Sequence, residues 1–437
     1  MKGIYSIVIV FLAWILFSNV LAQVEEDSTN KSTAIEGLKY KQQPGLALAA
    51  SKIFFSDKRY SISGFGEFNY IPVQTGVNTN LGDLELYYSG LYRFATFFGY
   101  RLRDNLIWNS EFQIELLHEK TNEVGHEIVV EAFVDWLFKD YFNARLGFYP
   151  LTIGYVNNND EPVMFYSVNR SDVERIITPS TWIEFGTMFY GSIREDLSYA
   201  LGISQGLTAK NYMSGTWIRQ GRSLHLDVPK SVSINPQLTY TGIENLTLST
   251  SGYFGKSGQG EHIEIDGVLN EVEAPIALYT AYAKYDWKNF RFVTTGSYGR
   301  LGETDKIAEL TNIHQGEHQI LGREVYGVLA EIGVDVLPYF RKNKERENKH
   351  NWFWSSEDLK LTVFGRYERL NTHLSIDQSL LLLPRVQKDL DVYTIGLNFN
   401  TRENIVFKTN YRFSSNRYQE VDKPINHLVE LGIGFIF

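Results

Sequence analysis

The last eleven residues, HLVELGIGFIF (427–437), decide the fold class because they alternate in the way that a strand requires. Every second residue is large and apolar: Val429, Leu431, Ile433, Phe435 and Phe437. The residues between them are small or mixed in polarity. Successive side chains of a strand point to opposite faces, so this stretch predicts a strand with one apolar face. Whether that face meets a protein core or lipid depends on the rest of the chain.

The N-terminus predicts an exported protein. Lys2 precedes the apolar run IYSIVIVFLAWILF (4–17), and Val20 and Ala22 are small enough for cleavage after Ala22. A transmembrane anchor is the alternative, but the run is short and the polar stretch QVEEDSTNKST follows it directly. We therefore predict a signal peptide over residues 1–22 and a periplasmic N-terminal segment, partly flexible, over residues 23–58. No other stretch approaches the length of a membrane helix, so any membrane insertion must use strands.

Short and long connectors alternate along the mature chain. The short ones are charged and rich in Asn or Asp, which suit tight turns: 103–105, 139–141, 194–196, 243–245, 287–289 and 402–404. The long ones are polar and irregular: 73–83, 157–180, 209–230, 257–275, 302–324, 373–388 and 417–425, with a brief one near 120–125. A seventh turn fits the basic stretch at 341–350. Seven turns and eight loops predict about 16 strands, the even number that bacterial barrels have.

The strands between these connectors keep their charges on one face. In LKLTVFGRYE (359–368), Leu361, Val363 and Tyr367 share one face, whereas Arg366 and Glu368 share the other. A soluble β-sandwich also alternates, so alternation alone leaves both folds open. The signal peptide, the loop asymmetry, the strand lengths and an aromatic content of 14% favour a membrane barrel.

We therefore predict an all-β protein, a transmembrane antiparallel up-and-down β-barrel of about 16 strands with short periplasmic turns and long external loops. The barrel is expected to span residues 59–437. An open strand edge in hydrocarbon leaves backbone groups without partners, so the first strand, at about 60–70, must pair with the last, at 426–437. The apolar face of the last strand then meets lipid.

One stretch is less generic: GFYPLTIGYVNNNDEPVMFYSVNRSDVERIITPSTWIEFG (147–186). It resembles a region of porins related to the phosphate-selective porin family, in which a Gly-x-x-Pro strand leads to a loop containing Glu-Pro-x-x-Phe and Thr-Trp-x-Glu-x-Gly. The matching positions here are Gly147, Pro150, Glu161, Pro162, Phe165, Val168, Arg170, Val173, Glu174, Ile177, Pro179, Thr181, Trp182, Glu184 and Gly186. The family's phosphate-binding members line the pore with many Arg and Lys, whereas this chain has a net charge of -9. Phosphate selectivity therefore does not follow from the resemblance.

By the strand count, this stretch contains the third external loop, at about 157–180. In porins of about 16 strands the third loop commonly folds inward and narrows the channel, so the count and the resemblance agree. The terminal Phe437 resembles the signature that the barrel assembly machinery of outer membranes reads. A homotrimer is the assembly that the resemblance suggests.

We expect charged residues at and beside the third loop to form the constriction: Asp160, Glu161, Arg170, Asp172, Glu174, Arg175 and Glu184. Close rings of fixed charge set which ions pass. Bracing is an equal alternative, with Arg170 and Arg175 pairing Glu174, Asp172 or Glu184, because buried charges are usually paired, and one pair could do both. Charged residues on the polar strand faces are expected to line the pore: Glu111, Glu131, Asp135, Arg145, Glu331, Asp335, Arg366, Lys408 and Arg412.

Other kinds of chemistry find little support. The absence of Cys excludes a disulfide framework and a thiolate metal site, and an acidic chain without a basic run is a poor candidate for nucleic-acid binding. HQGEH (314–318) has the H-x-x-E-H spacing of zinc peptidases, but Gly316 and the surrounding polar connector favour a solvated loop. We predict no catalytic residues, metal or cofactor.

The sequence thus predicts a porin in the outer membrane of a Gram-negative bacterium. It would be embedded in outer-membrane lipid and would let small hydrophilic solutes or ions diffuse passively through a water-filled barrel. Two alternatives stay open. One is a ligand-specific channel or receptor barrel for a sugar or an anion, and the weaker one is an outer-membrane hydrolase.

Overall fold

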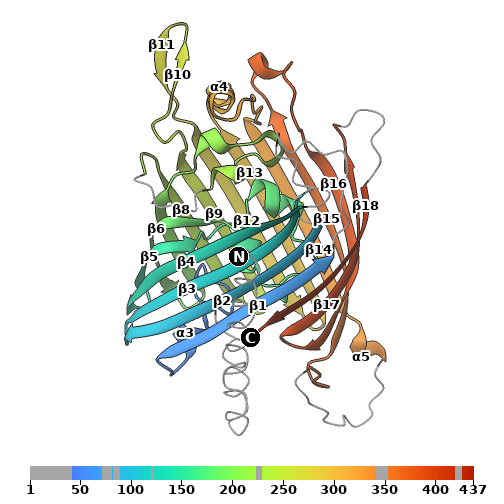
Figure 1. Cartoon of the computed structure of the whole chain (residues 1–437). Coiled ribbons are helices and arrows are strands. Elements are labelled where there is room, and N and C mark those ends of the chain that lie inside the picture. The colour runs from blue at the N-terminus through green and yellow to red at the C-terminus, as the bar shows by residue number, and fades with distance from the viewer. Residues whose placement is uncertain are drawn as a thin grey trace, which may run out of the picture.

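The structure is a computed structural model that describes residues 42–70, 81, 89–119, 123–222, 229–340, 353–418 and 426–437. Within these ranges it contains eighteen strands, and all but β10 and β11, which makes sixteen, close into one barrel (Figure 1). Every neighbouring pair in the barrel is antiparallel. The predicted fold class and strand number are therefore confirmed.

The barrel strands follow one another around the wall in chain order. They are β1 (Tyr60–Tyr70), β2 (Ser89–Arg103), β3 (Leu106–Glu119), β4 (Glu123–Lys139), β5 (Phe142–Pro150), β6 (Ile183–Arg194), β7 (Leu197–Gln205), β8 (Val232–Ile243), β9 (Leu246–Lys256), β12 (Pro275–Trp287), β13 (Phe290–Leu301), β14 (Glu324–Asp335), β15 (Lys360–Ser375), β16 (Asp389–Arg402), β17 (Ile405–Asn416) and β18 (Asn426–Ile436).

The remaining elements are short and lie in the connectors. β10 (His262–Ile265) and β11 (Val268–Glu271) form a hairpin that projects beyond the barrel in Figure 1. The helices are α3 (Lys52–Phe55), α4 (Thr304–Gln315), α5 (Leu337–Phe340), η3 (Val156–Asn158), η4 (Val173–Ile177), η5 (Ala209–Asn211), η6 (Ser214–Thr216), η7 (Arg219–Gly221) and η8 (Gln378–Leu380). In the described part of the chain, no helix is both long and apolar enough to cross a membrane.

The six short turns lie where the sequence predicts them, and they define the turn end of the barrel. Each leaves two residues between its strands, as at 104–105 between β2 and β3. Asn245 has a φ of +61° in the β8–β9 turn, a left-handed conformation that Asn tolerates better than most residues. The seventh connection joins β14 to β15 as predicted and begins with α5, although 341–350 itself lies outside the described residues.

The long connectors define the opposite, loop end. They are less irregular than predicted, since 302–324 contains α4 and 257–275 contains the β10–β11 hairpin. Most of 73–83 and of 417–425, and the whole of residues 1–22, lie outside the described residues.

The closing seam joins β1 to β18. Gly64 and Phe437 exchange two backbone hydrogen bonds, of 3.0 and 2.9 Å, and Gly66 is the register partner of Phe435. The two aromatic rings lie over the glycines: a Cβ added at Gly64 or Gly66 would come within 2.6 Å of the Phe437 or Phe435 ring, respectively. These glycines therefore make room for the terminal rings, and no free strand edge remains at this seam.

The two faces of the strands are the predicted ones. On β18, Val429 and Leu431 are 56% and 50% exposed on the outside, whereas Glu430 is 2% exposed on the inside. On β15, Val363 and Tyr367 lie outside, and Arg366 is buried inside. Large apolar side chains thus cover the outer wall, which is the surface that a hydrocarbon environment favours.

Part of the interior is drier than the sequence suggests. A buried apolar cluster inside the barrel includes Leu46, Tyr149, Trp182, Trp217 and Tyr253. These side chains come from the chain before β1, from two loops and from the wall, so the connectors fold inward and pack together. The alternation of the strands could not reveal this packing, because it reports only the wall.

Candidate functional site

Loop 3, residues 151–182 between β5 and β6, lies inside the barrel. It contacts inward side chains of the wall on several sides: Asp160 pairs with Arg93 of β2 at 3.0 Å, and the N–H of Val173 donates to Glu368 of β15 at 3.1 Å. Lys408 of β17 donates to the carbonyl of Phe165 at 2.8 Å. The loop thus crosses the lumen from one wall to the opposite one.

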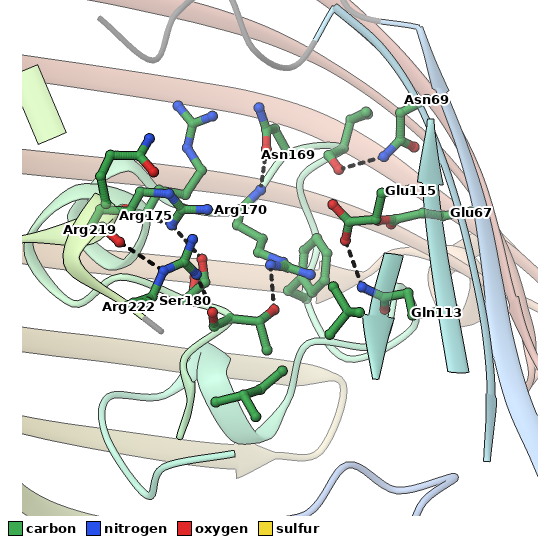
Figure 2. Close-up of a pocket in the computed structure, with 16 residues that line it drawn as sticks. Glu67, Asn69, Gln113, Glu115, Asn169, Arg170, Arg175, Ser180, Arg219 and Arg222 are labelled. Carbon is green, nitrogen blue, oxygen red and sulfur yellow. Dashed lines mark hydrogen bonds between the residues drawn. The ribbon is translucent and has the colours of Figure 1, made fainter. Parts of the chain in front are cut away.

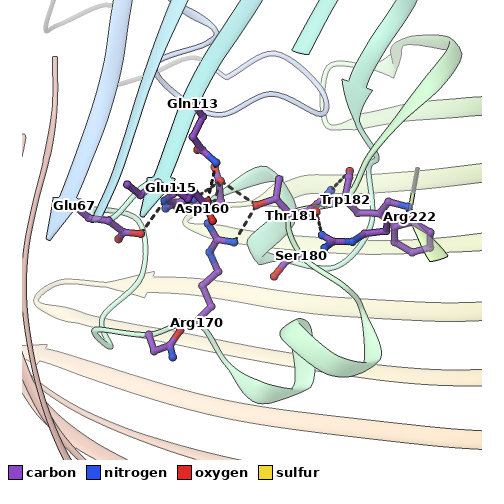
Figure 3. Close-up of polar contacts among 12 residues, drawn as sticks. Glu67, Gln113, Glu115, Asp160, Arg170, Ser180, Thr181, Trp182 and Arg222 are labelled. Carbon is purple, nitrogen blue, oxygen red and sulfur yellow. Dashed lines mark hydrogen bonds and ion pairs between the residues drawn. The ribbon is translucent and has the colours of Figure 1, made fainter. Parts of the chain in front are cut away.

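Asp160 ties the near side of loop 3 to the wall (Figure 3). Its carboxylate contacts Arg93 at 3.0 Å and Arg170 at 3.4 Å, and it accepts a hydrogen bond from Thr181 at 3.4 Å. Arg93 is fully buried and also pairs with Glu67 of β1 at 2.8 Å. A buried guanidinium between two carboxylates keeps its charge compensated, so this group braces the loop.

Asp172 ties the far side. It forms ion pairs with Arg175 of loop 3 and Arg412 of β17. These two guanidiniums outweigh the effect of burial and hold the pKa of the Asp172 carboxyl well below its usual range. Arg175 therefore pairs with a loop carboxylate, and it also borders the loop-end cavity described below.

Two further wall bases hold the middle of loop 3. Arg366 pairs with Glu368 at 2.9 Å and Glu331 at 3.7 Å, and it donates to the hydroxyl of Ser167. Lys408 donates to the carbonyls of Phe165 and Ser167 and lies 3.8 Å from the centre of the Phe165 ring. Arg366 and Lys408, which were predicted to line the pore, therefore contact loop 3 directly.

The carboxylates of Glu161 and Glu174 are buried and accept hydrogen bonds from backbone N–H groups. Glu174 accepts from Tyr155 and Val156 at the start of the loop, and a Cβ added at Gly154 would lie 2.6 Å from its Oε1. Burial is the main cause that raises the pKa of Glu161 and of Glu174 to about 7. Neither carboxylate lines the cavities described below, so a direct contact with passing solute is not what the geometry supports for them.

Glu161 instead holds the N-terminal segment, residues 42–55. It accepts hydrogen bonds from the N–H groups of Leu48 and Ala49, at 3.0 and 2.6 Å. The carbonyl of Ala49 accepts from Ser63 of β1 at 2.7 Å, and the carbonyl of Ala50 accepts from Asn109 of β3 at 2.7 Å. This segment therefore lies inside the barrel between loop 3 and the wall, at the side formed by β1–β5.

The other predicted lining residues lie in three places. Asp135 pairs with Arg145 at 3.1 Å, and Arg145 donates to the carbonyl of Pro44 of the N-terminal segment. Glu111 and Glu131 are cross-strand partners, both buried on the inner face, and Asp335 accepts from the N–H of Leu337 and Leu361 at the turn end. Glu184, which was predicted as a constriction residue, lies on β6 and accepts hydrogen bonds from Trp182 at 3.0 Å and from Gln205 at 3.1 Å.

Loop 3 separates two cavities. A cavity at the loop end, of about 190 Å³, is bordered by Phe165, Val168 and Arg170. A cavity at the turn end, of about 960 Å³, is bordered by Val163, Met164 and Tyr166, and its wall carries Lys284, Asp286, Arg291, Asp335, Lys360 and Glu403. The segment 163–170 therefore borders both spaces, and both are lined by charged groups.

The loop-end cavity is divided by charge (Figure 2). Arg170, Arg175, Arg219 and Arg222 line it from loop 3 and the next loop, while Glu67, Asn69, Gln113 and Glu115 line it from β1 and β3. Arg219 and Arg222 were not among the predicted site residues. They lie in the connector 209–230, where no periodic pattern distinguishes them from other polar loop residues.

HQGEH does not assemble a metal site in the structure. α4 ends within this motif, and Gly316 adopts a φ of +77° as its C-cap. His314 and His318 contact different carboxylates, Glu261 at 3.4 Å and Glu309 at 3.2 Å. Within the described residues, no group of three or more His, Asp or Glu side chains could hold a metal ion.

Comparisons with known proteins agree with the fold. No family model matches the chain. A protein of Aquifex aeolicus (strain VF5), described as uncharacterized, is 26% identical over 407 residues, which cover 91% of this chain and 84% of that protein. The outer membrane channel DcaP of Acinetobacter baumannii has a similar structure, with a TM-score of 0.51 and 11% identity over 86% of this chain and 97% of DcaP.

OmpF of Salmonella typhi, solved in complex with daunomycin, is similar to the same degree. Its TM-score is 0.51, with 9% identity over 86% of this chain and 97% of OmpF. These solved structures support the fold of an outer-membrane barrel. The resemblance of residues 147–186 to the phosphate-selective porin family stays a prediction.

Proposed function

We propose that the protein is an outer-membrane porin through which small hydrophilic solutes or ions diffuse passively. The turn end would face the periplasm and the loop end the exterior. Residues 1–22 would be removed as a signal peptide, Phe437 would be read by the barrel assembly machinery, and the barrel would form a homotrimer. The likeness of the fold to a solved outer membrane channel supports this proposal.

One observation carries the proposal: a charged loop is fixed across a closed barrel that has an apolar outside. Four buried bases of the wall, Arg93, Arg366, Lys408 and Arg412, bind loop 3 by ion pairs or hydrogen bonds. A soluble protein would gain no function from a charged loop fixed inside a closed barrel. In a channel, such a loop sets the narrowest cross-section and presents fixed charge to passing ions.

The direct test is electrical. Purified protein inserted into planar bilayers should give discrete ohmic current steps. Arg170→Gln should shift the salt-gradient reversal potential towards cation selectivity, because Arg170 lines the loop-end cavity and its side chain is 14% exposed there. Arg194→Gln is the matched control, since Arg194 lies at the turn end and its side chain is 62% exposed. The proposal would be contradicted if the wild type gave no current steps, or if both variants shifted the reversal potential equally.

A ligand-specific channel is the second candidate, and the small loop-end cavity favours it over a wide pore. A cavity of about 190 Å³ lined by ten charged or amide groups can hold a small solute in contact with several of them at once: Glu67, Asn69, Gln113, Glu115, Asn169, Arg170, Arg175, Arg219, Gln220 and Arg222. Specific solutes should then block the ion current in a saturable way, whereas a general porin would show no saturation.

A further inference from the structure

The arginine side of the loop-end cavity is held in a fixed geometry. Arg219 donates to the carbonyls of Arg175 and Ser180, at 3.0 and 2.6 Å, and Arg222 donates to the carbonyl of Arg219 at 2.9 Å. A carbonyl acceptor orients a guanidinium and itself carries no formal charge. Arg170 is oriented by Thr181 at 2.9 Å and by the carboxylate of Asp160 at 3.4 Å, and Arg175 is oriented by the carboxylate of Asp172. Preorganised guanidiniums are well suited to a carboxylate, because their planar N–H groups match its two oxygens.

The opposite side of the same cavity carries carboxylates and amides. Glu67 of β1 and Glu115 of β3 line it together with Asn69 and Gln113, and Figure 2 shows these four side chains across the cavity from the labelled Arg219 and Arg222. Gln113 donates to Glu115 at 2.8 Å, and Glu67 pairs with Arg93 at 2.8 Å. Carboxylate and amide oxygens are the acceptors that an ammonium group requires.

This segregation disfavours a plain anion. An anion that binds the arginines faces the carboxylate of Glu115 across a cavity of about 190 Å³, and like charges at close range raise the free energy of binding of such a ligand. A solute with a carboxylate at one end and an ammonium at the other satisfies both sides. The volume exceeds what one water needs and suits a solute of a few heavy atoms.

We propose that the loop-end cavity is a binding subsite for small zwitterions. The arginine side receives the carboxylate, and Glu115 with its neighbouring amides receives the ammonium. The subsite rests on the proposed function in that it would lie on the route of a diffusing solute, but binding itself requires no current.

The test is titration calorimetry of the detergent-solubilised full chain at pH 7 and low salt with three probes of one carbon skeleton. γ-Aminobutyrate carries both charges, butyrate only the carboxylate and butylamine only the ammonium. We expect γ-aminobutyrate to bind about tenfold more tightly than either single-charge probe, because it makes two charge-assisted contacts in place of one. This comparison uses the wild type alone, so it does not depend on how a variant folds.

Two variants then assign the sides. Glu115→Gln should abolish the advantage of γ-aminobutyrate over butyrate and strengthen butyrate binding, whereas Arg170→Gln should weaken both. Glu264→Gln, on the exposed β10–β11 hairpin, is the control and should change nothing. Butyrate or inorganic phosphate binding the wild type as tightly as γ-aminobutyrate, or no probe binding at all, would overturn the subsite. Conductance without preferential binding refutes the subsite alone, and binding without conductance refutes the porin alone.

Discussion

At the scale of single residues, the charges of loop 3 divide into two groups. Asp160, Glu161, Asp172 and Glu174 bind the loop, the wall or the N-terminal segment, whereas Arg170 and Arg175 also border the loop-end cavity. The sequence pointed to the charged residues of loop 3 but not to Arg219 and Arg222, and it could not assign each loop charge to one of the two groups. That assignment depends on backbone N–H groups, such as those of Leu48 and Ala49, that lie more than a hundred residues away from their acceptor.

Glu161 gives a pH-dependent prediction. Burial raises its pKa in the folded protein to about 7, above the ordinary value of 4.5, while Asp160 raises the pKa and Arg93 lowers it. Folding therefore disfavours the ionised carboxyl, so the stability that Glu161 allows is present at acid pH and is lost as the pH rises through about 7.

We expect the unfolding free energy of the wild type, relative to Glu161→Gln, to fall by roughly 2–3 kcal/mol between pH 5 and pH 8. Urea unfolding of both proteins in vesicles at the two pH values measures this difference. Glu174, whose pKa is also raised, is present in both proteins and cancels. Parallel pH profiles of the two proteins would contradict the prediction.

At the scale of elements, what could be predicted is what local sequence specifies. Period-two alternation predicted the strands, and Asn- or Asp-rich turns such as 244–245 predicted the turn end. Strands and tight turns both depend on residues that are close together in the chain. The inward course of residues 42–55 depends on distant partners, and buried side chains of α4 such as Ile307 and Leu310 pack in the barrel cluster. The β10–β11 hairpin, by contrast, is local, since its strands pair across Asp266 and Gly267, but it was not predicted from the sequence. Asn109 and Ser63, which bind the N-terminal segment, look like ordinary polar wall residues in the sequence.

Two variants at the seam between β1 and β18 can distinguish a packing role of Phe437 from recognition of Phe437 by the assembly machinery. Phe435→Ala and Phe437→Ala each remove one ring that covers a glycine of β1, and the rings' loss should lower the stability of refolded protein to a similar extent. If the assembly machinery reads the terminal residue, Phe437→Ala alone should reduce the amount of folded barrel in the outer membrane several-fold. Heat-modifiable electrophoretic mobility of membrane fractions measures that amount. Equal losses in cells for the two variants would leave packing as the whole role of Phe437.

At the scale of the whole molecule, the apolar outer wall predicts how a charge placed on it should affect stability in lipid. Ile395 lies near the middle of β16 and is 63% exposed on the outside. Ile395→Lys should destabilise the barrel in lipid vesicles by about 2–4 kcal/mol, since a charge at mid-membrane is costly, whereas on a water-facing surface the same change would cost little. Ile395→Ala is the control, because it removes the side chain without adding charge. Equal urea midpoints for the two variants would show that this face does not meet hydrocarbon.

The N-terminal segment has a consequence for the order in which the molecule forms. Residues 42–55 precede β1, yet they lie within a wall that is complete only once β18 has joined β1. Inserting this stretch into a finished cylinder would require passing it between loop 3 and the wall, to the place where Glu161 and Asn109 bind it. In the simpler order, the stretch packs against the partly formed sheet first. β17 and β18 then complete the barrel around it when β18 pairs with β1. The earliest described part of the chain would thus act as an internal template, and its removal should slow the last step of biogenesis more than it weakens the finished wall.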